Sequence, residues 1–264
     1  MNENEYFKAN RDAWNKKTAV HKNAEFYDVP SFRSGKSTLN PAELEALGSV
    51  RDKSMLHLQC HFGLDTLSWA REGACVTGID FSEAAIETAE QLSKELGIPA
   101  SFICCNIYDT LQNISETFDI VFTSYGVTGW LPDLDRWAAV IAAALKPGGI
   151  FFLAEFHPFV WMMDEDFREI KYPYHNREVI REEISGTYAD RNSGIAYTEY
   201  GWNHSLSEVI GSLIRHGLTI QHFKEYPYSY YPCFRQMVAG EDGYWRIIGL
   251  EDKLPLMYAV KAIK

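Results

Sequence analysis

The chain has 264 residues, of which 46% are hydrophobic, so it can bury a substantial core. Its formal net charge of -11 at pH 7 disfavours binding to nucleic acid or to an anionic membrane, because both depend on clustered Lys and Arg. The composition therefore predicts a small-molecule partner, with no nucleic acid and no membrane.

The cysteines and the first residues of the chain favour a cytoplasmic protein. The five cysteines are an odd number without C-x-x-C spacing, and the chain does not begin with a basic flank followed by an apolar run. No apolar stretch approaches the roughly 20 residues that a membrane-spanning helix needs. The sequence does not indicate an oligomeric state.

Residues 1–52 precede the first expected strand, and we interpret them as an N-terminal helical lid segment. One helix is expected near residues 5–18, followed by irregular chain.

From about Lys53 onward, short apolar runs alternate with helical periodicity, which is typical of β-α units and a mostly parallel sheet. Residues 55–58 predict a strand, 59–63 a tight turn that opens a helix, and 76–80 a second strand that ends at Asp80. This order is typical of a nucleotide-type cofactor site, in which a turn and a helix N-terminus meet one end of the ligand and a carboxylate binds the ribose.

Five further strands are expected at residues 100–105, 118–123, 150–156, 218–225 and 256–262. Ser82 is a candidate cap for a helix that ends at Gly97, and Ser205 with Glu208 forms a candidate capping box for another. The pattern predicts an α/β protein with a Rossmann-like, doubly wound sheet of seven strands.

Residues 157–204 are too many for an ordinary connection, so we interpret them as an insertion within one domain that spans residues 53–264. Within the insertion, residues 187–190 and 195–202 predict a hairpin.

Four motifs, in this order and spacing, resemble those of the class I S-adenosylmethionine-dependent methyltransferases, particularly of bacterial small-molecule members. They are His57-Leu58-Gln59-Cys60-His61-Phe62-Gly63, Gly78-Ile79-Asp80-Phe81-Ser82, Phe118-Asp119-Ile120-Val121 and Leu145-Lys146-Pro147-Gly148-Gly149. The resemblance covers about residues 50–156 well and the rest more loosely. It implies an antiparallel last strand and a cofactor, S-adenosyl-L-methionine, lying across the carboxyl ends of the first four strands.

The resemblance also implies particular cofactor contacts. Asp80 would accept hydrogen bonds from the two ribose hydroxyls, while Asn106 would read the adenine edge and Ile107 would pack on the ring. The alternatives are a turn acid that caps the next helix and a helix-capping Asn beside a core Ile. The candidate cofactor-binding residues are His57, Gln59, Cys60, His61, Gly63, Asp80, Phe81, Asn106, Ile107, Ser124 and Tyr125.

The first loop departs from the family pattern of an acid followed by three alternate glycines. Those four positions hold His57, Gln59, His61 and Gly63. Gln59 and His61 must therefore adopt backbone angles that suit glycine, or the loop must swing outward. His57 would replace the acid near the ligand's ammonium group, or the two histidines form hydrogen bonds within the loop. Together with Cys60 they fit no metal-binding motif, so no metal site is expected.

Methyl transfer depends mainly on positioning and water exclusion, and it needs a base only when the acceptor is protonated. His157, which follows the expected strand at 150–156, is the candidate base. The alternative is that His157 holds the insertion by a hydrogen bond while Glu155 caps a backbone amide. The many aromatic residues of 157–204 and 226–231 either roof an apolar acceptor pocket or pack the core.

The leading hypothesis is an S-adenosylmethionine-dependent methyltransferase that acts on a small, aromatic or hydrophobic acceptor. One alternative is a nicotinamide-dependent oxidoreductase, since Asp80 would suit that ribose too, although the first loop lacks the glycines that a pyrophosphate needs. Another is a non-catalytic cofactor-binding protein that has lost turnover.

Overall fold

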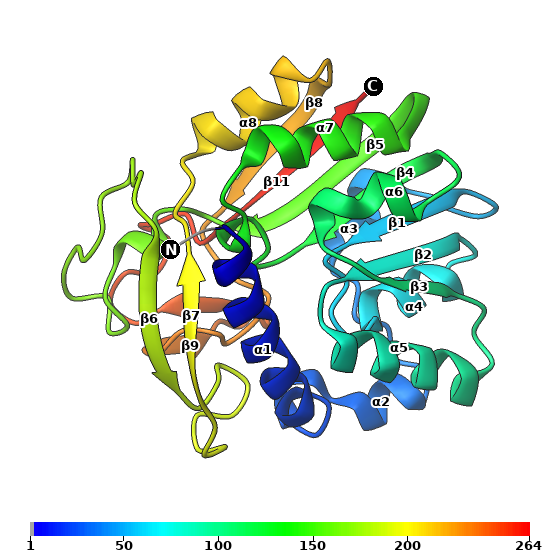
Figure 1. The fold of residues 1–264 in the computed structure, drawn as a ribbon. Coiled ribbons are helices and arrows are strands. Elements are labelled where there is room, and N and C mark those ends of the chain that lie inside the picture. The colour runs from blue at the N-terminus through cyan, green and yellow to red at the C-terminus, as the bar shows by residue number, and fades with distance from the viewer. Residues whose placement is uncertain (1–2) are drawn as a thin grey trace.

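The computed structural model describes residues 3–264 and contains a seven-stranded sheet with helices on both faces (Figure 1). Its strands are β1 (Ser54–Leu58), β2 (Cys75–Asp80), β3 (Ser101–Cys104), β4 (Phe118–Ser124), β5 (Leu145–Phe156), β8 (Thr219–Tyr226) and β11 (Met257–Ile263). They lie in the order β3-β2-β1-β4-β5-β11-β8, and β11 runs antiparallel to both neighbours. The predicted fold class, including the antiparallel last strand, is confirmed.

The central strands are buried on both faces, as expected for a sheet covered by helices on each side. On β4, Val121 packs in one core cluster with Trp137, and the next residue, Phe122, packs in the other cluster with Trp69. Successive side chains of a strand point to opposite faces, so this single strand contributes to both cores. The two clusters fix the sheet between its helix layers.

Two of the helices that cover the sheet begin directly after their predicted caps, Ser82 and Ser205. The covering helices are α4 (Leu64–Arg71), α5 (Glu83–Leu96), α6 (Thr110–Asn113), α7 (Leu134–Ala144) and α8 (Leu206–Arg215), with short 3-10 turns at Ile107–Asp109, Thr128–Trp130 and Val160–Met162. Ser82 Oγ accepts a hydrogen bond from the Ala85 amide at 3.1 Å, and Ser205 with Glu208 forms the expected capping box. Both predicted caps are confirmed.

The N-terminal segment contains more helix than expected. It forms α1 (Glu3–His21), a 3-10 turn (Glu25–Tyr27), α2 (Val29–Arg33) and α3 (Pro41–Leu47). The prediction of irregular chain after the first helix was therefore wrong. The overlooked signals are local: Asp28 caps α2, and Asn40 with Glu43 forms a capping box on α3, each helix having a proline in its first turn.

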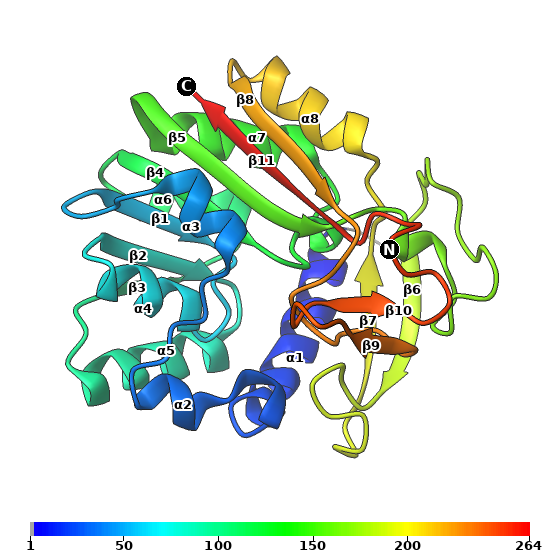
Figure 2. The same cartoon turned by 180° about the vertical axis from the view of Figure 1, so that it is seen from behind.

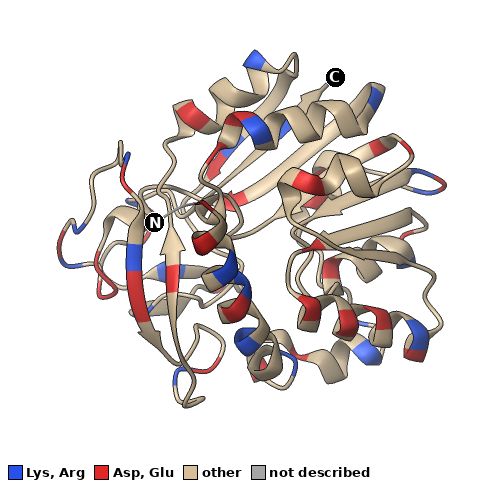
Figure 3. Ribbon diagram, in the orientation of Figure 1, with Lys and Arg blue, Asp and Glu red and all other residues tan. Residues whose placement is uncertain are grey.

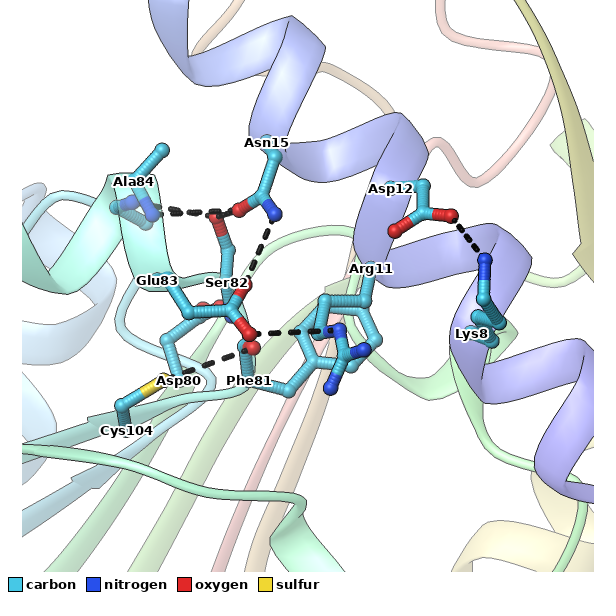
Figure 4. A network of polar contacts seen from close by, with 11 residues as sticks. Lys8, Arg11, Asp12, Asn15, Asp80, Phe81, Ser82, Glu83, Ala84 and Cys104 are labelled. Carbon is cyan, nitrogen blue, oxygen red and sulfur yellow. Dashed lines mark hydrogen bonds and ion pairs between the residues drawn. The ribbon is translucent and has the colours of Figure 1, made fainter.

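α1 lies across the carboxyl edge of the sheet, between α5 and the insertion (Figure 1). On the α5 side, Asn15 Oδ1 accepts a hydrogen bond from Ser82 Oγ at 2.7 Å, and Asn15 Nδ2 donates to Glu83 at 2.8 Å (Figure 4). On the other side, the Asn10 side chain donates to the Tyr200 carbonyl and accepts from the Tyr200 amide, both at 2.8 Å. The N-terminal helix thus bridges the sheet domain and the insertion.

The insertion contains a hairpin, although its first strand lies earlier in the chain than predicted. β6 (Ile180–Ser185) pairs antiparallel with β7 (Ala196–Gly201), whereas Thr187 lies in a turn and its Oγ1 accepts from the Asp190 amide at 3.0 Å. Three consecutive charged residues, Arg181, Glu182 and Glu183, concealed the half-buried face of β6. A second hairpin, β9 (Met237–Ala239) with β10 (Trp245–Ile247), lies between β8 and β11 and was not predicted (Figure 2). Within residues 3–264, no helix is long and apolar enough to cross a membrane.

Candidate functional site

A cavity of about 540 Å³ lies at the carboxyl edge of the sheet, beneath α1 and the β6–β7 hairpin. All eleven candidate cofactor-binding residues line it, from His57 at the end of β1 to Tyr125 after β4. Open α/β sheets bind ligands at this edge, where the strand order reverses between β1 and β4.

The first loop follows a left-handed path at alternate positions. The φ angles of Gln59, His61 and Gly63 are 58°, 51° and 80°. Two non-glycine residues therefore adopt the conformation that usually belongs to glycine, at a cost of about 1–2 kcal/mol each. Side-chain contacts accompany this path, since Gln59 Nε2 donates to the Val127 carbonyl at 3.0 Å and the His61 ring lies 5.1 Å from that of Trp14. The loop accordingly keeps its course with Gln59 and His61 in place of two of the three glycines of the family pattern.

Asp80 is buried at the tip of β2, with 8% of its surface exposed. Its Oδ2 accepts a hydrogen bond from the His61 amide at 2.8 Å, and its Oδ1 accepts from the Ser82 amide at 2.9 Å. Burial raises the pKa of Asp80 to about 6, against the lowering effect of these amides. Because a carboxylate can accept about four hydrogen bonds, both oxygens keep capacity for a ligand hydroxyl.

Asn106 follows β3 and has the capping role of the alternative interpretation, at a position on the cavity wall. Its Oδ1 accepts from the Tyr108 amide at 3.0 Å and so caps the 3-10 turn, while the residue also lines the cavity. The neighbouring Ile107 is 6% exposed and belongs to the core while it lines the same wall.

His57 is held by neutral groups at the end of β1. Its Nδ1 lies 2.8 Å from Thr66 Oγ1, and its Nε2 lies 3.4 Å from Ser124 Oγ. Burial lowers the pKa of His57 to about 3, so the ring is neutral. This geometry agrees with a histidine that forms hydrogen bonds at the base of the loop.

Asp65, in the first turn of α4, is a cavity residue that sequence reasoning missed. Its Oδ2 accepts from Ser124 Oγ at 2.9 Å and its Oδ1 from Thr38 Oγ1 at 2.6 Å. Burial raises the pKa of this carboxyl group. Its only sequence signal was an acid in a first helical turn, a common feature of surface helices.

Glu43 was also missed, although it holds a candidate site residue. Tyr125 has a left-handed φ of 38°, and its hydroxyl donates to Glu43 Oε1 at 3.0 Å. Asn40 Nδ2 donates to the same oxygen at 2.9 Å and to the Tyr231 hydroxyl at 2.8 Å. Burial raises the pKa of Glu43 to about 8. α3 therefore fixes two tyrosines on the cavity wall.

The structure does not bring His157 together with the other candidates, because it lies outside the cavity. Its Nδ1 accepts from the Phe159 amide at 3.1 Å, and its Nε2 lies 3.0 Å from Glu225 Oε1. Glu155 accepts hydrogen bonds from the amides of Val127 and Thr128 at 2.7 and 2.9 Å. Both residues therefore have the geometry of the alternative interpretation, in which their side chains accept hydrogen bonds from backbone amides.

The cavity residues fit the cofactor that the resemblance implies. Asp80 supplies a buried carboxylate with spare acceptor capacity, and Asn106 supplies an amide beside the apolar Ile107 and Phe81. The left-handed first loop supplies backbone groups next to the N-terminus of α4, where a ligand carboxylate is favoured. These are the residues that would hold the adenosyl and amino-acid parts of S-adenosyl-L-methionine.

Comparison with known proteins agrees with this arrangement. Residues 55–149 match the family model described as a methyltransferase domain. The ubiquinone biosynthesis O-methyltransferase of Chromobacterium violaceum is 30% identical over 118 residues, which are 43% of this chain and 50% of that protein. The chain thus matches about half the length of this curated relative.

Solved structures share the fold. A methyltransferase structure from Listeria monocytogenes superposes with a TM-score of 0.56 at 20% identity and covers 84% of this chain and 96% of its own. The geranyl diphosphate C-methyltransferase of Streptomyces coelicolor A3(2), solved with S-adenosyl-L-homocysteine, gives 0.54 at 14% identity and covers 83% and 73%. The chain therefore matches a methyltransferase-domain model at residues 55–149 and shares the fold of solved S-adenosylmethionine-dependent methyltransferases.

Proposed function

We propose that this protein transfers a methyl group from S-adenosyl-L-methionine to a small-molecule acceptor. The observation that carries the proposal is the position of Asp80, a buried strand-end carboxylate that faces one cavity together with the left-handed first loop. When bound, the cofactor supplies an electrophilic methyl group on a sulfonium. The residues of this chain hold the ligands and exclude water.

Positioning is the main catalytic contribution expected of the protein, because an in-line displacement needs the acceptor atom about 3 Å from the methyl carbon. α1 and the β6–β7 hairpin cover the cavity, and this cover excludes water. We assign no base role to His157, since its ring nitrogens face Phe159 and Glu225. We also propose that residues 1–52 act as a lid on a domain formed by 53–264, with 157–204 as its insertion.

A small-molecule acceptor suits the charge of the chain, and its five free cysteines support a cytoplasmic location. Figure 3 shows Lys and Arg dispersed over helices, strands and loops, and Asp and Glu outnumber them by 36 to 25 in the sequence. Such a surface gives little attraction to a polyanion. The name of the Chromobacterium relative, an O-methyltransferase, favours a hydroxyl group as the acceptor.

Calorimetric titration with S-adenosylhomocysteine tests the proposal, followed by an assay of labelled methyl transfer to a panel of small hydroxylated compounds. We expect binding and transfer. Absence of binding at millimolar ligand would overturn the cofactor assignment, and tighter binding of a nicotinamide dinucleotide would favour the oxidoreductase alternative. Binding without transfer to any acceptor would favour the non-catalytic alternative.

A further inference from the structure

One face of the β6–β7 hairpin forms a wall of the cavity. Alternate residues of both strands line it: Ile180, Glu182 and Ile184 from β6, and Tyr197, Glu199 and Gly201 from β7. Glu182 and Glu199 are directly opposed in the antiparallel register, so two carboxylates lie side by side on this wall. Figure 3 shows acidic residues on both strands of the hairpin. Opposed like charges destabilise a ladder unless each has a counter-charge.

Each carboxylate has its own lysine. Lys171 Nζ lies 2.6 Å from Glu182 at the rim, where the lysine side chain is 47% exposed. Lys17 Nζ, from α1, lies 2.7 Å from Glu199 Oε2, and its side chain is only 3% exposed. The deeper pair is therefore a desolvated ion pair on the cavity wall, while the Glu199 side chain keeps 19% of its surface exposed.

Aromatic rings surround the deeper pair. The Lys17 ammonium lies 4.6 Å from the ring centres of Trp14 and Trp130 and 4.8 Å from that of Tyr197, all of which line the cavity. Trp14 also contacts the His61 ring of the first loop at 5.1 Å. This part of the cavity therefore adjoins the candidate cofactor residues.

We propose that the Lys17–Glu199 pair, with Trp14, Trp130 and Tyr197, forms the acceptor subsite and selects an uncharged aromatic compound that carries a hydroxyl group. The inference rests on the proposed methyltransferase function. The indole and phenol rings pack against the planar body of the acceptor, and the carboxylate of Glu199 accepts a hydrogen bond from its hydroxyl.

The charge balance of the wall determines this choice. On the hairpin wall Lys17 is committed to Glu199 and to three rings, and Lys171 is paired with Glu182. A carboxylate on the acceptor would therefore meet two glutamates whose lysines are already engaged. A cationic acceptor would be desolvated against a carboxylate that a lysine already neutralises. A neutral hydrogen-bond donor satisfies Glu199 without adding a charge to the cavity.

The first test compares three ligands by calorimetry on the wild-type protein saturated with S-adenosylhomocysteine. Catechol has the ring and the donors, 1,2-dimethoxybenzene has the ring without donors, and 3,4-dihydroxybenzoate adds a negative charge. We expect catechol to bind at least tenfold more tightly than either analogue. Equal binding of dimethoxybenzene, tighter binding of the benzoate, or no binding of catechol would overturn the inference.

The second test uses the double variant Lys17→Met/Glu199→Gln, because removing one member alone would leave a buried charge. We expect the variant to keep its affinity for S-adenosylhomocysteine within about twofold and to bind catechol at least tenfold more weakly. Glu183→Gln removes one charge from the outer, exposed face of the same hairpin and serves as the matched control.

A double variant that folds, binds S-adenosylhomocysteine and retains its catechol affinity would show that the ion pair only fastens α1 to β7. The wild-type comparison decides the matter if the double variant does not fold. A wild-type protein that does not bind S-adenosylhomocysteine would overturn the proposed function, whereas binding of that ligand without a preference for catechol would overturn this inference alone.

Discussion

Asp80 is the residue whose side chain we expect to matter most for cofactor affinity. Replacing it by Asn keeps the shape but removes the charge behind the two hydrogen bonds that we propose Asp80 accepts from ribose hydroxyls. We expect Asp80→Asn to weaken binding of S-adenosylhomocysteine by about 1–3 kcal/mol, measured by calorimetry. Glu87→Gln, an exposed change on α5, is the control. An unchanged dissociation constant for Asp80→Asn would contradict the ribose role.

The same carboxyl group predicts how cofactor affinity depends on pH. Burial raises the pKa of Asp80 to about 6. In the proposed ribose contact, only the ionised form can accept a hydrogen bond from both hydroxyls. Binding should therefore be constant above about pH 7 and weaken below pH 6, by about tenfold per unit once protonation dominates. Titrations between pH 5 and 8 check this, and Asp80→Asn should remove the dependence. A wild-type affinity that is flat across this range would count against Asp80.

Gly63 is the position of the first loop at which a side chain would clash with its neighbours. Its φ is 80°, and a Cβ there would lie 2.9 Å from Ala89 Cβ and 2.9 Å from the Phe102 ring. Gly97 has a similar φ of 63° but open space around it. We expect Gly97→Ala to cost about 1 kcal/mol in the free energy of unfolding, from backbone strain alone, and Gly63→Ala about 2–4 kcal/mol. Urea titration measures both, and equal losses would show that contact with Ala89 is unimportant.

The place of a single site residue could be predicted when the sequence on either side of it had a clear strand or helix-cap pattern. Asp80 ends an apolar strand and precedes a capped helix, so its place at the cavity followed from local pattern. Asp65 and Glu43 gave no such signal, because their surroundings come from distant parts of the chain. Glu43 meets Tyr125 across 82 positions, and Asp65 meets Ser124 across 59.

His157 links two elements of the fold. It lies directly after β5, and its ring faces Glu225 on β8. Its ring accepts from the Phe159 amide and faces Glu225, and burial lowers its pKa. We expect His157→Ala to lower the free energy of unfolding by about 1–3 kcal/mol, since an amide donor loses its partner. Affinity for S-adenosylhomocysteine and kcat should change less than twofold. A large fall in kcat with normal stability would instead restore His157 as the base.

The strands of the seven-stranded sheet could be predicted from the sequence, whereas the strands of the insertion that covers the cavity were harder to predict. Strands such as β4 carry apolar residues on both faces and stand out in the sequence. β6 has only one half-buried face, and its exposed Arg181 and Glu183 resemble a loop. Its strand character depends on pairing with β7 and on the cavity beneath it, neither of which the local pattern contains.

At the scale of the whole molecule, the cavity arises where three separate segments meet. The first loop, α1 and the insertion converge on His21, whose ring lies 5.3 Å from His61, 6.1 Å from Trp14 and 4.9 Å from Tyr188. The fold class of the sheet followed from the sequence, but this convergence did not, since it depends on contacts of His21 with His61 and Tyr188, which lie 40 and 167 positions away in the chain.

His21 therefore provides a test of the assembled molecule. It is fully buried, and within residues 3–264 neither of its ring nitrogens has a hydrogen-bond partner. Replacing it by Leu removes two unsatisfied polar atoms, so we expect His21→Leu to raise the free energy of unfolding at pH 7 by about 1–3 kcal/mol. Urea unfolding at pH 7 measures this gain.

Acid should enlarge that difference. Burial, with the nearby Lys17 charge, lowers the pKa of His21 to about 3, while an unfolded histidine titrates near 6.5. The native state binds fewer protons, so its stability is complete above pH 6.5 and falls as the pH decreases toward 3. Between pH 7 and 5 the advantage of His21→Leu should grow by about 2 kcal/mol. His21→Gln is polar but does not titrate. Its stability relative to wild type should increase by the same amount between pH 7 and 5, but its gain in the free energy of unfolding at pH 7 should be smaller than that of His21→Leu. A constant difference between variant and wild type would mean that His21 reaches solvent and that α1 does not seal this side of the cavity.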